Sequence, residues 1–97
     1  MHGSGQEGPW EVYIIRAANG ALYTGIARDA ARRFEAHAQG RGAKFFRVSE
    51  ARDLVFREMH ESRREAQRRE AEIKRMPRAE KLTLISEARR GRNGSRT

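Results

Sequence analysis

Five side chains in this sequence have the types and spacing to act on a phosphate group. They are, in chain order, Tyr13, Tyr23, Arg33, His37 and Glu70. An arginine is always charged and can grip two phosphate oxygens at once. A carboxylate is a preferred ligand of Mg²⁺ or Mn²⁺, and Mg²⁺ commonly uses one or two carboxylates together with water and substrate phosphate. Each residue type also has an ordinary structural role, so the elements that position these side chains decide between the two interpretations.

The two tyrosines lie in two β-rich runs, EVYIIRA and ALYTGIA, that an Asn-Gly pair separates. This pattern predicts a β-hairpin. With a two-residue loop, Tyr13 would oppose Ile26 and Tyr23 would lie on the other face of the sheet. With a three-residue loop, Tyr13 opposes Gly25 and the tyrosines share one face. The sequence permits either register, and a strand tyrosine often simply covers a sheet face.

Arg33 and His37 are four residues apart in a segment that is predicted to be a helix. Asp29 has the residue type of an N-cap, and Gly40 closes the segment. The spacing places both side chains on one helical face. We expect Arg32 to be a surface residue, whereas Arg33 is the candidate phosphate ligand.

Glu70 lies in a second predicted helix, which Ser62 opens with the capping box Ser-Arg-Arg-Glu. Ala66, Glu70 and Ile73 share a narrow apolar stripe, and a carboxylate on a packing face is unfavourable without a partner. Two partners fit: one of the many arginines, or a divalent cation. Pro77 ends this helix and begins the next.

The remaining segments complete one small α+β domain. A strand is predicted over DLVFREM, residues 53–59, and a last helix over RAEKLTLISEARR. The order β-β-α-β-α-α predicts a three-stranded antiparallel sheet with flanking helices. We expect a flexible lead-in over residues 1–9, the domain over 10–90 and a basic flexible tail over 91–97.

Composition adds a prediction about partners. The 97 residues have a formal net charge of +8 and a pI near 11.2, which favours a polyanion such as nucleic acid. The alternative is a solvated surface on which arginine and glutamate pair with each other. There is no cysteine, which excludes disulfides and cysteine-based metal sites. No apolar run approaches the ~20 residues of a membrane span and no signal peptide is visible, so we expect a cytoplasmic protein with no membrane partner.

Taken together, the motifs Val12-Tyr13-Ile14 and Tyr23-Thr24-Gly25, followed by Arg33, His37 and Glu70, resemble the GIY-YIG nuclease domain. The resemblance covers residues 12 to 76, and it is greatest with small stand-alone bacterial members, which share segments of the LYTGI, GAK and REAEIK type. It implies the GIY-YIG fold and a metal-dependent endonuclease that hydrolyses DNA, either structure- or end-selective.

The resemblance also implies a role for each residue. Glu70 would bind Mg²⁺ or Mn²⁺, and Arg33 would bind an oxygen of the scissile phosphate. Tyr13 would deprotonate or align the attacking water, while Tyr23 and His37 would orient it. Apart from the resemblance, the residues themselves predict a basic loop of Arg41, Lys44 and Arg47 next to the site, which would hold backbone phosphates while an aromatic ring meets a base. Of its two phenylalanines, Phe45 and Phe46, we expect at least one in the core.

Two alternatives accompany the nuclease prediction. A nucleic-acid-binding module with weak or no cleavage would keep the fold, and a small adaptor would use its Arg/Glu-rich helices to bind a protein. GIY-YIG nucleases often have an asparagine after the metal-binding glutamate, but residues 71–92 contain none. RNA remains an alternative substrate, and a protein partner could provide targeting.

Overall fold

The structure, a computed structural model, describes residues 7–41, 44, 46 and 49–94. Over these residues the elements follow the predicted order β-β-α-β-α-α. The strands are β1 (Glu7–Ala17), β2 (Leu22–Ala27) and β3 (Ala51–Ser62). The helices are α1 (Ala30–Ala38), α3 (Arg63–Arg75) and α4 (Arg78–Gly94). The chain therefore has the α+β class expected from the sequence.

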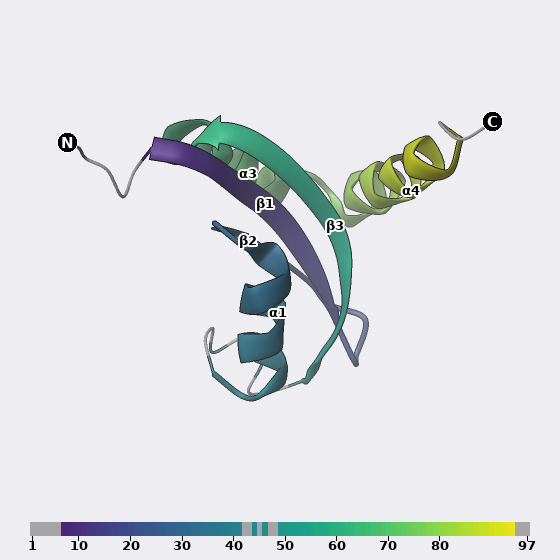
Figure 1. Cartoon of the computed structure of the whole chain (residues 1–97). Helices are drawn as coiled ribbons and strands as arrows, with labels where there is room; N and C mark the ends of the chain where they lie inside the picture. Colours follow the sequence, from purple (N-terminus) through teal and green to yellow (C-terminus); the bar gives the residue numbers. More distant parts are fainter. Residues whose placement is uncertain (1–6, 42–43, 45, 47–48, 95–97) are drawn as a thin grey trace.

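The sheet has the strand order β2-β1-β3, and both pairings are antiparallel. The central strand β1 has helices on both of its faces, so its side chains from 11 to 15 are all buried. One face packs with α1 in a cluster of Tyr13, Ile15, Ala17, Ala27, Ala30, Phe46 and Ala51. The other packs with α3 and α4 in a cluster of Val12, Ile14, Phe56, Ala66, Ile73 and Ile85. In Figure 1, β1 and β3 curve together around α1, and α4 lies outside the curve.

The predicted helix starts are confirmed by hydrogen bonds at the caps. Asp29 Oδ1 accepts the backbone N–H of Arg32 at 3.1 Å, and Ser62 Oγ accepts that of Glu65 at 3.2 Å. Each cap satisfies a backbone donor that has no partner within its own helix. These caps fix where α1 and α3 begin, and so which side chains of each helix face the sheet.

The ends of three elements differ from the sequence-based bounds. Strand β3 is longer than 53–59, and β1 begins at Glu7, because Glu7 pairs with Ser62 and the two strands extend together. Pro9 is tolerated there because it lies at a register shift between Glu7 and Trp10, where a ladder hydrogen bond is not required. Helix α4 continues to Gly94, so residues 91–94 of the expected tail are helical, and residues 95–97 lie outside the described part.

Candidate active site

The hairpin places both tyrosines on one face of the sheet. Tyr13 is opposite Gly25 and Ile15 is opposite Tyr23, which is the register of the three-residue loop. The loop closes with the Ala17 N–H donating to the Ala21 carbonyl at 2.9 Å. Gly20 has a φ of +90°, a value that a glycine adopts without strain. The structure thus decides between the two registers that the sequence permits.

Gly25 provides the space into which the Tyr13 side chain extends. A Cβ atom at position 25 would lie 2.6 Å from Tyr13 Oη and 2.8 Å from Tyr13 Cζ, which is too close for any real contact. The phenol therefore lies directly over the backbone of β2. Sequence reasoning named this glycine as part of a motif and as the residue opposite Tyr13 in one register, but it did not predict this close approach, which a glycine inside a strand often marks.

The two tyrosine rings and His37 form one aromatic cluster with Phe46. Tyr13 Oη lies 3.3 Å from His37 Nε2. The ring centroid of Tyr23 is 6.3 Å from that of Tyr13 and 5.5 Å from that of His37. Phe46 packs 4.7 Å from His37 and 5.2 Å from Tyr23, between centroids. The expectation that at least one loop phenylalanine is a core residue is confirmed by Phe46, which is buried; Phe45 lies outside the described residues.

Burial sets the protonation state of this cluster. The pKa of Tyr13 is raised above 10.0 chiefly by its burial, with Tyr23 and Glu70 acting in the same direction and Arg33 opposing them. The pKa of His37 is lowered below 6.5 by burial and by the charge of Arg33, while a backbone hydrogen bond with Arg41 opposes the shift. At neutral pH both groups are therefore uncharged. A phenolate base at Tyr13, one of the two roles considered above, is disfavoured in the free protein.

Arg33 and Glu70 bring opposite charges to the same phenol. Both residues shift the pKa of Tyr13 through their charges, although one belongs to α1 and the other to α3. Arg33 is exposed, whereas the Glu70 side chain is 21% exposed and its Oε2 lies 3.1 Å from Lys74 Nζ. Among the residues that the structure describes, the ion-pair partner of Glu70 is thus a lysine one turn away, and not one of the arginines considered from the sequence.

Comparison with known proteins gives the family to which the chain belongs. The model of the GIY-YIG catalytic domain matches residues 9–83, a range that includes all five side chains. The chain belongs to the GIY-YIG family. This is a nuclease family. The match confirms the family resemblance that the sequence motifs indicated.

The relatives of this GIY-YIG chain are small bacterial UPF0213 proteins. A Pseudomonas aeruginosa UPF0213 protein is 49% identical over 76 residues, which cover 78% of this chain and 73% of the relative. A Staphylococcus aureus UPF0213 protein is 47% identical over 76 residues, which cover 78% and 93%. The solution NMR structure of a UPF0213 protein from Bacillus halodurans has 37% identity and a TM-score of 0.50, covering 80% of this chain and 83% of that one.

The basic loop of the GIY-YIG domain is described only in part. Arg41 and Lys44 are exposed, and the Arg41 N–H donates to the Ala36 carbonyl at 2.9 Å, just beyond the end of α1. Arg47 lies outside the described residues. Of the three predicted phosphate ligands of this loop, two are thus in contact with solvent.

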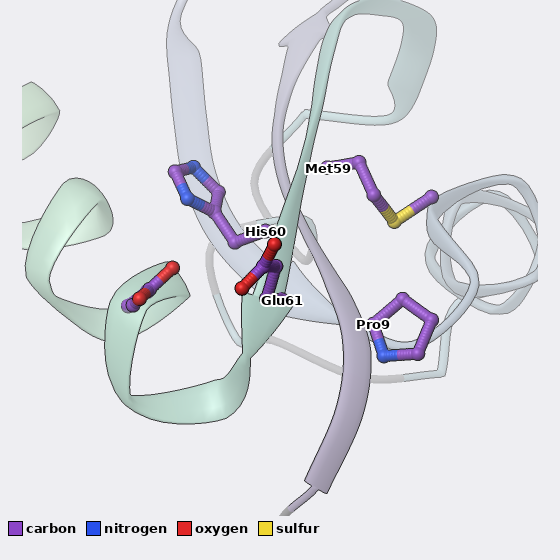
Figure 2. A pocket seen from close by; sticks show the side chains of 5 residues that line it. Pro9, Met59, His60 and Glu61 are labelled. Atoms are coloured by element: carbon purple, nitrogen blue, oxygen red, sulfur yellow. The ribbon is translucent and has the colours of Figure 1, made fainter.

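Two hollows of similar volume lie near the start of β1, and they differ in charge. Figure 2 shows one of about 560 Å³, lined by Pro9, Met59, His60, Glu61 and Glu65. None of the five site residues borders it, and its two carboxylates disfavour a phosphate. The other, of about 570 Å³, is lined by Arg33 together with Trp10, Ala27, Arg28, Asp29, Arg32 and Ala36. It adjoins the GIY-YIG site.

An ion pair between the buried Glu11 and the exposed Arg57, which sequence reasoning missed, lies at the start of α1. Glu11 is 4% exposed, and its Oε2 accepts the Ala30 N–H at 2.8 Å, at the first residue of the helix. Its Oε1 accepts Arg57 Nε at 2.8 Å. The hydrogen bond with Arg57 is the main reason that the pKa of Glu11 is lowered, and Ala30 acts in the same direction against burial. A glutamate within an otherwise apolar strand was the available signal.

Two further observations concern metals and membranes. Within the described ranges, no three His, Cys, Asp or Glu side chains are grouped so that they could hold a metal ion. Glu70 would have to bind a cation together with water and substrate, as the sequence interpretation supposed. No helix of the described chain combines the length and the apolar character needed to cross a membrane.

Proposed function

We propose that this protein is a divalent-metal-dependent endonuclease that hydrolyses phosphodiester bonds in DNA. The observation that supports it most directly is the convergence at Tyr13. Its hydroxyl contacts His37, its ring neighbours that of Tyr23, and the charges of Arg33 and Glu70 both act on it. Phosphodiester hydrolysis needs a positioned water, a cation for the phosphoryl oxygens and help for the leaving oxygen.

Arg33 is the proposed ligand of the scissile phosphate. It is exposed, so a DNA strand can reach it. It lies on the same helix as His37, which belongs to the aromatic cluster. Arginine binds phosphate with two parallel hydrogen bonds, which fixes the orientation of the ester as well as its position. Its positive charge becomes more effective as negative charge grows on the phosphoryl oxygens in the transition state.

The Tyr13–His37 pair is the proposed path for the proton of the attacking water. Because the pKa of Tyr13 is raised and that of His37 is lowered, the hydroxyl keeps its proton and the neutral imidazole can accept one. The water gives a proton to Tyr13 Oη while the hydroxyl proton passes to His37 Nε2. Tyr13 thus remains neutral throughout, and Tyr23 holds the ring of His37 in place by edge-on packing.

Glu70 is the proposed ligand of the divalent cation. Magnesium accepts a single protein carboxylate when water and substrate phosphate complete its coordination. The competing Lys74 pair is an i,i+4 contact with an exposed lysine, and such pairs contribute only about 0.3–0.5 kcal/mol. A divalent ion at Glu70 would supply charge neutralisation of the phosphate and stabilisation of the leaving oxygen. The cation would also offset the effect of the Glu70 charge on Tyr13.

A cleavage panel tests the proposal. Flap, nicked, single-stranded and duplex DNA are incubated with Mg²⁺, with Mn²⁺ and with EDTA, and products are separated by denaturing electrophoresis. We expect cleavage of at least one substrate that EDTA abolishes. Glu70→Ala and Arg33→Ala should each lower the rate by about 10²-fold or more.

The matched control is Glu87→Ala, which removes an exposed carboxylate of α4 and should leave the rate unchanged. Salt-sensitive DNA binding without cleavage of any substrate would contradict the proposal and favour the alternative of a binding module. Cleavage that persists in Glu70→Ala at the wild-type rate would contradict the assignment of the metal ligand.

A further inference from the structure

The basic hollow beside the site contains more positive charge than the five site residues explain. Three exposed guanidinium groups border it, those of Arg28, Arg32 and Arg33, with Trp10 at one side. Its one carboxylate, Asp29, accepts the Arg32 N–H and so caps α1. The charge of Asp29 is therefore directed at the helix N-terminus, and the excess of two positive charges attracts a phosphodiester.

Trp10 organises one of these arginines. The Arg28 guanidinium carbon lies 5.1 Å from the centroid of the indole ring, and that of Arg63 lies 5.3 Å from it. A guanidinium stacked on an aromatic ring has a fixed plane and loses little further freedom when the N–H groups at its edge bind an anion. The stacking thus holds the Arg28 guanidinium in a fixed plane, from which two of its N–H groups can bind two oxygens of a phosphate.

Arg33 connects the hollow with the other candidate site residues. This residue borders the hollow, and its charge also acts on Tyr13 and His37. A DNA strand whose scissile phosphate lies on Arg33 would therefore continue either toward the hollow or away from it. In the direction of the hollow, the described surface offers two further cations, Arg28 and Arg32, next to the Trp10 ring.

We propose that this hollow binds the phosphate next to the scissile one, on the same DNA strand, through Arg28 and Arg32. The inference rests on the proposed function for the position of the scissile phosphate. It assigns a binding role to Arg32, which the sequence suggested to be an ordinary surface residue. It also explains why the only tryptophan of the chain lies at this point.

Because Trp10 is the only tryptophan, its fluorescence reports on the hollow without a label. The experiment titrates the full chain with a short DNA duplex in EDTA, following tryptophan emission, and measures affinity separately by the anisotropy of dye-labelled DNA over a range of salt concentrations. The test variant is the double substitution Arg28→Gln and Arg32→Gln. The matched control is Arg52→Gln and Arg75→Gln, two exposed arginines that do not border the hollow.

We expect DNA to change the emission of the wild-type protein and of the control. In the test variant the affinity should fall about tenfold or more below that of the control. The slope of log K against log salt should become shallower by about 0.9 for each phosphate of the duplex that the variant no longer neutralises. Circular dichroism confirms that both variants are folded.

Equal affinity and equal salt slopes in the two double variants would overturn the inference, as would DNA binding that leaves the Trp10 emission unchanged. These outcomes are separable from failure of the proposed function, because the binding assays contain no metal and need no cleavage. If the cleavage panel fails while the test variant loses affinity, the hollow remains a DNA-binding site.

Discussion

Gly25 limits what can stand next to the phenol of Tyr13. We predict that Gly25→Ala forces the ring to move, because the new Cβ would lie 2.6 Å from Oη. Overpacking of this kind costs about 1–3 kcal/mol of unfolding free energy, and a displaced hydroxyl should also slow cleavage. Urea denaturation and the cleavage assay measure the two effects. Gly91→Ala is the control: its Cβ meets no atom within 4 Å, so the substitution should stabilise α4 by up to about 1 kcal/mol.

Protonation of His37 should make the cleavage rate fall at acidic pH. The pKa of His37 lies below its ordinary value of 6.5, because burial and Arg33 disfavour the charged ring. We therefore expect a constant rate near neutral pH that falls as His37 becomes protonated, with a midpoint below 6.5. The acid limb should be lost in His37→Gln. A midpoint above 6.5 in the wild-type protein, or an identical limb in the variant, would contradict the role of His37 as proton acceptor.

At the scale of the elements, helix starts decide which residues meet. Ser62 accepts the Glu65 N–H and so fixes the first turn of α3, the helix that presents Glu70. Ser62→Ala should lower the unfolding free energy by about 1 kcal/mol. Thermal denaturation measures this, with Ser86→Ala on the exposed side of α4 as the control. A loss no larger than that of the control would show that the cap contributes nothing to stability.

At the scale of the whole molecule, Glu11 joins three elements. Its carboxylate connects β1 to the first residue of α1 and to Arg57 of β3. We predict that Glu11→Gln costs about 1–3 kcal/mol at neutral pH, because the buried carboxylate that Arg57 and the Ala30 N–H both contact loses its charge. Urea denaturation measures the difference, and Glu35→Gln, an exposed carboxylate of α1, should stay within about 0.5 kcal/mol of wild type.

The ion pair between Glu11 and Arg57 should make the stability of the protein depend on pH. The pKa of Glu11 is lowered in the folded protein, so its stabilising contribution is complete above the ordinary value of 4.5 and is lost as the pH falls below it, through the folded pKa. The difference in stability between wild type and Glu11→Gln should therefore shrink on acidification. A difference that stays constant down to about pH 3 would contradict this explanation.

The sequence determined the elements of the fold that depend on neighbouring residues. Capping residues, an Asn-Gly turn and helical spacing are local signals, so Asp29, Ser62 and the order of the elements could be predicted. The family motifs predicted the tyrosines, Arg33, His37 and Glu70 as site residues, and their roles stay predictions. Local signals did not give the ends of β1 and β3, because these strands lengthen by pairing with each other, and the paired Glu7 and Ser62 are 55 positions apart in the sequence.

Only the tertiary structure decided which of the candidate residues lie together and in which protonation states. Either hairpin register satisfied the local rules, and packing of both faces of β1 selected the one that unites the tyrosines. The neutral states of Tyr13 and His37 follow from burial, which depends on α1 and Phe46 covering them. Residue types and spacing specify which groups are available, whereas desolvation and distance arise only when segments far apart in the chain come together.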